Sequence, residues 1–132
     1  QKDLGYVSYG VVMRTKLSAE KMLPRVIEEI QKLKVRSLRI VDASGYSLLA
    51  DIFVIGTVDS VIQLESVRNR VIEEMEKHGW YLKNPLEPWE GGWLLLDFGD
   101  MIFHIMLEEL RSFYGLDHLI EGREITAEVV SL

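Results

Sequence analysis

The sequence predicts a single domain of the α/β (α+β) class, in which helices pack against a sheet. Two stretches, at about residues 18–34 and 60–78, carry apolar residues at helical spacing. Residues 92–104 hold two apolar runs that meet at a Gly-containing pair, which is typical of a β-hairpin. With 132 residues and 48% hydrophobic content, the chain is large enough for one core and short for two domains.

Composition excludes several classes of function. The absence of cysteine removes disulfides, thiol nucleophiles and Cys-ligated zinc, and the apolar runs are too short to span a membrane, so we expect a soluble cytoplasmic protein. Fifteen basic residues against 21 acidic ones give a net charge of −6, which disfavours direct binding to nucleic acid. The same charge suits a basic protein partner, and ribosomal proteins are one such class.

The first half of the chain alternates helix and strand. Residues 1–12 begin with Gln and precede Met13, so we expect an extension or an expression remnant there and assign it no structure. Residues 18–34 are predicted as an amphipathic helix that is entered near Pro24. Strands are expected at 36–42 and 51–57. Only eight residues join them, which favours an antiparallel pair, and the more apolar second strand should be central.

The predicted second helix, residues 60–78, has clear ends. Ser60 and Gln63 fit a capping box at its start, and Gly79 is placed to end it. A short strand is expected at 80–83, followed by an irregular loop at 84–92 that contains Trp89. After the hairpin, residues 108–114 and 116–120 are predicted as helical turns, and the tail from Glu121 as a weak added strand.

The hairpin is the most informative stretch. If Phe98-Gly99 is the two-residue turn, Asp97 faces Asp100 and Trp93 faces His104. Alternation then gives one apolar face, formed by Leu94, Leu96, Met101, Phe103 and Ile105. The opposite face mixes apolar, aromatic, acidic and imidazole side chains. It is formed by Trp93, Leu95, Asp97, Asp100, Ile102 and His104.

This mixed face allows two interpretations. It is either a functional surface, or a purely structural layer in which Trp93 packs under a helix, the two aspartates bind turn amides and His104 is a neighbour of Trp93. Two like charges directly opposite destabilise a strand pair unless something offsets them. Arg111 could supply that charge within the chain, but we expect a cation of a docked partner to do so.

Catalytic templates fit poorly. Asp97-Phe98-Gly99 matches the magnesium-binding tripeptide of protein kinases, but the glycine-rich loop and the catalytic loop motif are missing. Asp100 and His104 lie about 13 Å apart along a strand, so they cannot share one ion. We therefore expect no catalytic residue, no metal and no cofactor.

Two blocks of residues resemble the ribosomal silencing factor family, also called the Iojap-like family. The first runs from Asp42 through Ser47, Ala50-Asp51 and Phe53-Val54-Ile55 to Ser60 and Gln63. The second is Trp93-x-x-x-Asp97-Phe98-Gly99-Asp100-x-x-x-His104-Ile105, followed by Glu109-x-Arg111-x-x-Tyr114-x-Leu116-x-x-Leu119. The resemblance covers about residues 20–120. Phe98 stands where the family often has Tyr, and Leu107-Glu108 where many members have His-Pro.

The resemblance implies a mixed sheet of about five strands flanked by helices, similar to a nucleotidyltransferase fold, in a domain at 13–120 with a C-terminal extension at 121–132. It implies a translational repressor that binds the large ribosomal subunit, through its protein numbered fourteen, and blocks joining of the small subunit. Homodimers are also implied. The partner-binding residues expected on this basis are Trp93, Asp97, Phe98, Asp100, His104, Arg111 and Tyr114.

A nucleotidyltransferase is the alternative, with Asp42, Asp51 or the Asp97/Asp100 pair holding magnesium. Such enzymes usually have a Gly-Ser entry followed by an Asp-x-Asp strand. Here Ile52 and Phe53 follow Asp51 and supply no second carboxylate. The steric blocker, which needs no chemistry, is therefore favoured.

Overall fold

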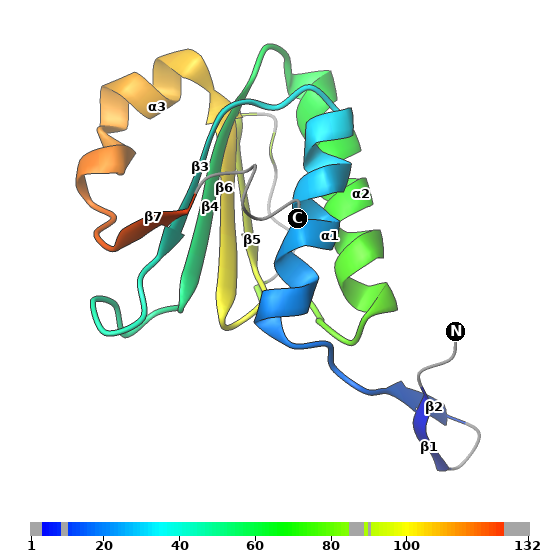
Figure 1. The fold of residues 1–132 in the computed structure, drawn as a ribbon. Coiled ribbons are helices and arrows are strands. Elements are labelled where there is room, and N and C mark those ends of the chain that lie inside the picture. The colour runs from blue at the N-terminus through cyan, green and yellow to red at the C-terminus, as the bar shows by residue number, and fades with distance from the viewer. Residues whose placement is uncertain (1–3, 9–10, 85–88, 90, 126–132) are drawn as a thin grey trace.

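The computed structural model describes residues 4–8, 11–84, 89 and 91–125, with side chains from Thr15 onward. A five-stranded sheet lies between two helical layers (Figure 1). Helices α1 (Ala19–Lys32) and α2 (Val61–Lys77) cover one face, and α3 (Glu108–Tyr114) covers the other. This arrangement confirms the predicted single α+β domain with a mixed five-stranded sheet.

The sheet has the strand order β5-β6-β4-β3-β7, and the bounds are β3 (Arg36–Asp42), β4 (Ile52–Val58), β5 (Trp93–Asp97), β6 (Met101–Leu107) and β7 (Arg123–Ile125). β4 and β6 are parallel, and the other neighbours are antiparallel. Every residue of β4 is buried because helices cover both of its faces. The antiparallel pairing of β3 with β4 and the central place of β4 are thus confirmed.

A second, two-stranded sheet precedes the domain. It pairs β1 (Leu4–Ser8) with β2 (Val11–Arg14) in antiparallel fashion and projects away from the main body (Figure 1). The sequence alone gave no reason to assign structure to residues 1–12.

The first helix, α1 (Ala19–Lys32), lies within the predicted range of residues 18–34. Ser18 is its N-cap, and its hydroxyl accepts a hydrogen bond from the Lys21 amide at 3.3 Å. The prediction that the helix is entered near Pro24 was wrong, because Pro24 lies inside the helix. A capping serine that satisfies a free amide marks the start better than a proline, which is only tolerated near it.

The second helix, α2 (Val61–Lys77), begins as predicted. The Ser60 hydroxyl accepts a hydrogen bond from the Gln63 amide at 3.2 Å. The Gln63 side chain accepts from the Asp59 amide at 3.0 Å and donates to the Leu33 carbonyl at 2.9 Å. The cap therefore also ties the start of α2 to the end of α1.

Replacing Ser60 with alanine should lower the free energy of unfolding by about 1 kcal/mol, because the Gln63 amide loses its acceptor. Urea denaturation measures this loss, and Ser112→Ala, at an exposed position within α3 (Glu108–Tyr114), is the matched control. Binding to ribosomal particles should be unchanged at saturating folded protein. A folded Ser60→Ala protein that fails to bind would mean that Ser60 is a partner contact.

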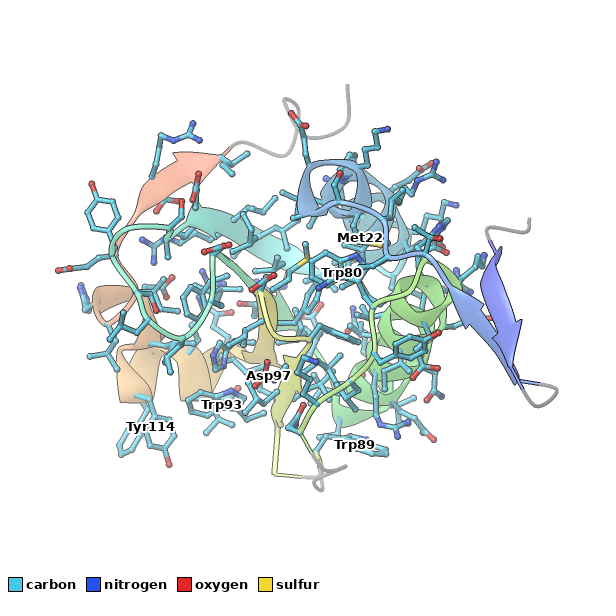
Figure 2. All side chains as sticks on the ribbon, turned by 90° about the horizontal axis from the view of Figure 1, so that it is seen from below. Met22, Trp80, Trp89, Trp93, Asp97 and Tyr114 are labelled. Carbon is cyan, nitrogen blue, oxygen red and sulfur yellow. The ribbon has the colours of Figure 1, made fainter. Side chains whose placement is uncertain are left out.

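Two apolar cores lie on the two faces of the sheet. The larger lies under α1 and α2 and includes Met22 and Trp80, which Figure 2 labels. Trp80 is only 2% exposed, and its indole N–H donates to the Leu17 carbonyl at 2.6 Å. The smaller core lies under α3 and the short 3-10 helix η1 (Leu116–His118).

The strand predicted at 80–83 is absent. The Lys83 amide donates to the Asp97 carbonyl at 2.7 Å. The next backbone groups of β5 do not bond to a strand backbone but to the side chain of Asn84. The Asn84 amide group donates to the Leu95 carbonyl at 3.1 Å and accepts from the Asp97 amide at 2.8 Å. Asn84 thus replaces a neighbouring strand at this edge of β5. The loop that follows lies largely outside the described residues; in it, Trp89 lies 5.0 Å from the Arg68 guanidinium.

The hairpin forms, but its register differs from the predicted one by two residues. Asp97 pairs with Ile102 and Leu95 with His104, and the turn is Gly99-Asp100, closed by the Phe98 amide and the Met101 carbonyl at 3.0 Å. Gly99 has φ +93°, as a type II′ turn requires at its first central position. Phe98 continues the apolar alternation of β5 into the core, where it is 1% exposed. A shift of two residues preserves the faces, so the predicted sorting of side chains is confirmed.

The C-terminal elements follow the sequence. The turns predicted at 108–114 and 116–120 are α3 and η1, and the tail strand is β7 where it is described. Among the residues that the structure describes, none of the helices combines the length and the apolar character needed to cross a membrane.

Candidate partner-binding surface

The structure brings three of the predicted site residues together, from β5, β6 and α3. The Trp93 ring lies 5.8 Å from His104 and 5.3 Å from Tyr114, measured between centroids. Figure 2 shows Trp93 and Tyr114 side by side. Trp93 meets Tyr114 because it pairs with Met106, near the end of β6, and α3 begins two residues later, at Glu108.

Phe113 belongs to the same surface, although the sequence reasoning did not select it. It is 79% exposed, and its ring packs edge-on against Tyr114 at 5.0 Å. Tyr114 is itself 55% exposed. We call Trp93, His104, Phe113 and Tyr114 the aromatic cluster. The adjacent Phe113-Tyr114 pair could have indicated an exposed aromatic surface from the sequence, because a short helix can hardly bury both of two adjacent aromatic residues.

His104 is held in one tautomer. Its Nδ1 accepts a hydrogen bond from the Trp93 indole N–H at 3.1 Å, so the proton of the neutral ring is on Nε2. Among the described residues, Nε2 has no hydrogen-bond acceptor. Phe53 stacks on the ring at 6.5 Å, and burial lowers the pKa of His104 to about 4 because the charged form loses hydration. His104 is therefore a neutral hydrogen-bond donor at physiological pH.

Asp97 and Asp100 lie at the other end of the hairpin. Trp93 and Asp97 are four residues apart on β5, or roughly 13 Å. The prediction that the two aspartates face each other was wrong, because the register places Ile102 opposite Asp97. The Asp97 carboxylate instead accepts from the Gly99 amide at 2.7 Å, and Asp100 lies 3.8 Å from the Lys16 ammonium. The cross-strand pairing of two carboxylates, for which we expected a partner's cation, is therefore absent.

Phe98 is a core residue and not a surface one. Its ring packs edge-on against Phe103 at 5.7 Å and is 1% exposed, so a partner cannot reach it in this fold. The turn begins one residue later than expected, at the glycine that can adopt positive φ.

Arg111 points into an internal polar network and not toward the hairpin aspartates. Its guanidinium binds both carboxylate oxygens of Asp117, at 2.8 and 2.9 Å. It also donates to the Thr57 hydroxyl at 2.9 Å and to the Ser37 carbonyl at 2.7 Å. The Arg111 guanidinium holds the pKa of Asp117 below its usual range, with Arg39 adding to the effect.

A bulge in β3 makes this network possible. The register of β3 against β4 shifts between Arg36 and Arg39, and Ser37 has φ +50°, which a non-glycine residue rarely adopts. The Ser37 carbonyl accepts from Arg111 at this irregular point. Arg111 thereby ties α3 to β3 and β4.

The carboxylates of the enzyme alternative are spread over the fold. Asp42 accepts from Ser44 and Arg123, and the Ser44 hydroxyl is the main cause that lowers the pKa of Asp42. Asp51 is exposed at the start of β4. Across the part of the chain that the structure describes, no three His, Cys, Asp or Glu side chains come close enough to hold a metal ion.

Comparisons with known proteins agree with the resemblance. The model of the family "Ribosomal silencing factor during starvation" matches residues 16–130. A ribosomal silencing factor of Halalkalibacterium halodurans is 26% identical over 78% of this chain and 88% of its own length. One of Bacillus subtilis is 31% identical over 59% of this chain and 66% of its own length.

The chain is also similar to a mouse protein with a mitochondrial name and to a solved bacterial structure. A mouse protein named "Mitochondrial assembly of ribosomal large subunit protein 1" is 29% identical over 71% of this chain and 42% of its own length. A crystal structure of a Chromobacterium violaceum protein superimposes with a TM-score of 0.73 at 24% identity, covering 83% of this chain and 92% of that one. With the family model matching most of its length, the chain belongs to the ribosomal silencing factor family.

Proposed function

We propose that this protein binds the large ribosomal subunit and sterically prevents the small subunit from joining it. Membership of the silencing-factor family supplies the link to the ribosome, and the name of the mouse relative supplies a link to the large subunit. The observation that carries the proposal here is the aromatic cluster, a partly exposed set of rings on a rigid scaffold. Steric exclusion needs only a docked domain, so it requires no catalytic residue.

The cluster has the character of a protein contact. Tyr and Trp combine a large apolar area with a polar tip and few rotatable bonds, which is why they dominate binding energy at interfaces. Phe113 and Tyr114 expose more than half of their surface, and such rings are costly to leave in water. Trp93 packs against Tyr114 and is fixed by its hydrogen bond to His104, so little ordering is needed on binding.

Charge favours a protein partner over ribosomal RNA. The net charge of −6 opposes contact with phosphates, whereas it steers a basic ribosomal protein toward this domain. We propose as partner the large-subunit protein numbered fourteen, which the resemblance implies, and we propose the cytoplasm as the compartment of this contact. A homodimer through the same face would compete with that partner.

Sedimentation with isolated ribosomal subunits tests the proposal. We expect the protein to pellet with large subunits and not with small ones, and light scattering should show slower and less complete joining of the two subunits in its presence. Sedimentation equilibrium of the protein alone tests the homodimer. Joining that proceeds normally at saturating protein would contradict the blocking role.

Replacing Tyr114 with alanine should weaken binding to the large subunit by about 2 kcal/mol, roughly thirtyfold in Kd, if the aromatic cluster is the contact. Titration of labelled protein with large subunits measures the change. Tyr81→Ala is the matched control because Tyr81 is exposed to a similar extent, 50% against 55%, but lies outside the cluster. Equal affinity of the two variants would place the contact elsewhere.

A further inference from the structure

A cavity of about 460 Å³ opens beside the aromatic cluster, and residues distant in sequence form it. Leu48 and Leu49 line it from the loop between β3 and β4, and Leu116 and Leu119 line it from η1 and the residue after it. Phe53 of β4 and His104 of β6 also line it. We call this cavity the loop–helix pocket.

His104 gives the pocket one polar group of fixed orientation. Because Trp93 occupies Nδ1, the N–H of the neutral ring is on Nε2, which has no acceptor among the described residues. No buried side-chain nitrogen or oxygen of the described residues lacks a partner, so Nε2 is accessible to solvent or to a ligand. The lining also includes the hydroxyl side chains of Tyr46 and Ser47, but most of it is apolar. His104 adds a ring N–H donor that stays uncharged down to about pH 4.

The exposed leucines at the opening of the loop–helix pocket favour a protein surface over a small molecule as its occupant. The volume is within the range of about 300–1,000 Å³ usual for small-molecule clefts, but such clefts enclose their ligand. Here Leu48 is 105% exposed, Leu49 76% and Leu119 75%, so the apolar surface extends outside the cavity. A small molecule would leave those leucines in water, whereas a protein surface would cover them.

Charge narrows the choice of partner. Glu121 is the one charged residue in the lining of the pocket, as far as the described residues show, and the chain as a whole is acidic. A neutral or basic segment is therefore accepted, and an acidic one is repelled. A second copy of this chain, with the same net charge of −6, is the less favoured occupant.

We propose that the loop–helix pocket takes an apolar anchor side chain from a Lys- or Arg-rich segment of a large-subunit ribosomal protein, and that His104 Nε2–H donates to a backbone carbonyl beside that anchor. This inference rests on the proposed function, since it assigns the pocket to the same partner. It adds a second contact next to the aromatic cluster, joined to it through His104.

Charged substitutions at the rim test the pocket. Leu48→Asp and Leu119→Asp should each weaken binding to purified large subunits by about tenfold or more, because both side chains become charged where the partner is apolar. Ile62→Asp is the matched control: Ile62 is 78% exposed, but lies on α2, in the helical layer on the other face of the sheet. All three positions are largely exposed, so the melting temperatures should stay close to that of the wild type.

The donor is tested separately from the walls. His104→Phe removes the N–H and should lower affinity, whereas His104→Gln, which can still accept from Trp93 and donate into the pocket, should restore part of it. A photo-crosslinking residue at position 48 should join the protein to a large-subunit protein, at an apolar residue near Lys or Arg, and the same residue at position 62 should not.

The outcomes separate the two proposals. Wild-type protein that does not sediment with large subunits overturns the proposed function. Wild-type protein that does sediment, while the position 48 and 119 variants bind as tightly as Ile62→Asp, overturns the pocket alone. Crosslinks from position 48 to ribosomal RNA or to a second copy of the chain also overturn the pocket assignment.

Discussion

Replacing Arg111 with alanine is expected to lower the free energy of unfolding by about 3 kcal/mol, the largest single-residue effect on stability that we anticipate outside the apolar core. The Arg111 side chain is 14% exposed, and its guanidinium donates hydrogen bonds to Asp117, Thr57 and the Ser37 carbonyl. Its removal leaves the buried Thr57 hydroxyl and the Ser37 carbonyl without this donor, and leaves the Asp117 carboxylate with Arg39 alone, at 3.3 Å. Buried polar groups that lose a partner cost more than a made bond contributes. Guanidinium or urea denaturation measures the loss.

Arg25→Ala is the matched control for Arg111→Ala. Arg25 is an exposed residue of α1, and surface substitutions of this kind usually change stability by less than about 0.5 kcal/mol. Arg111→Lys should recover little, because an ammonium cannot bind both Asp117 oxygens and the two remaining acceptors together. If Arg111→Ala unfolds like the wild type but no longer binds large subunits, Arg111 is a partner contact, as the sequence first indicated.

Acidification should destabilise the protein through His104. In the unfolded chain His104 takes up a proton near its ordinary pKa of 6.5, whereas in the folded protein burial lowers this pKa to about 4. Between about pH 6.5 and pH 4 the unfolded state therefore binds up to one proton more than the folded state, and stability falls as the pH falls toward 4. The total loss is about 3 kcal/mol, and the His104 contribution is constant above pH 6.5.

The His104→Gln variant isolates this effect. Glutamine does not titrate and can accept from Trp93, so the difference in unfolding free energy between wild type and variant should change by about 1 kcal/mol per pH unit between pH 6 and 4.5. Glu29, Asp42 and Asp117 have lowered pKa values, so their losses come mainly below about pH 4.5, outside this window. Parallel curves for the two proteins would mean that His104 is not buried as the structure has it.

The sequence by itself determined most elements of the domain and the faces of the hairpin, but not the β1–β2 sheet or the absence of a strand at 80–83. Helical spacing located α1 and α2, the Ser60 cap fixed the start of α2, and alternation separated the two faces of the hairpin. These signals are local: each depends on residues within one or two turns or one strand. The face assignment held although the register was wrong, because a shift of two residues leaves every side chain on the same side.

Tertiary structure decided which of the predicted site residues meet. Trp93, His104 and Tyr114 come together, whereas Phe98 enters the core and Arg111 turns toward Asp117. The sequence could not predict which of these residues are exposed and which are buried. The hairpin register depends on how Phe98 packs on Phe103, and two of the groups that Arg111 binds come from β3 and β4. The loop–helix pocket is the extreme case. Leu48 and Leu119 stand 71 residues apart, and only the pairing of β3, β4 and β6 places them around one cavity.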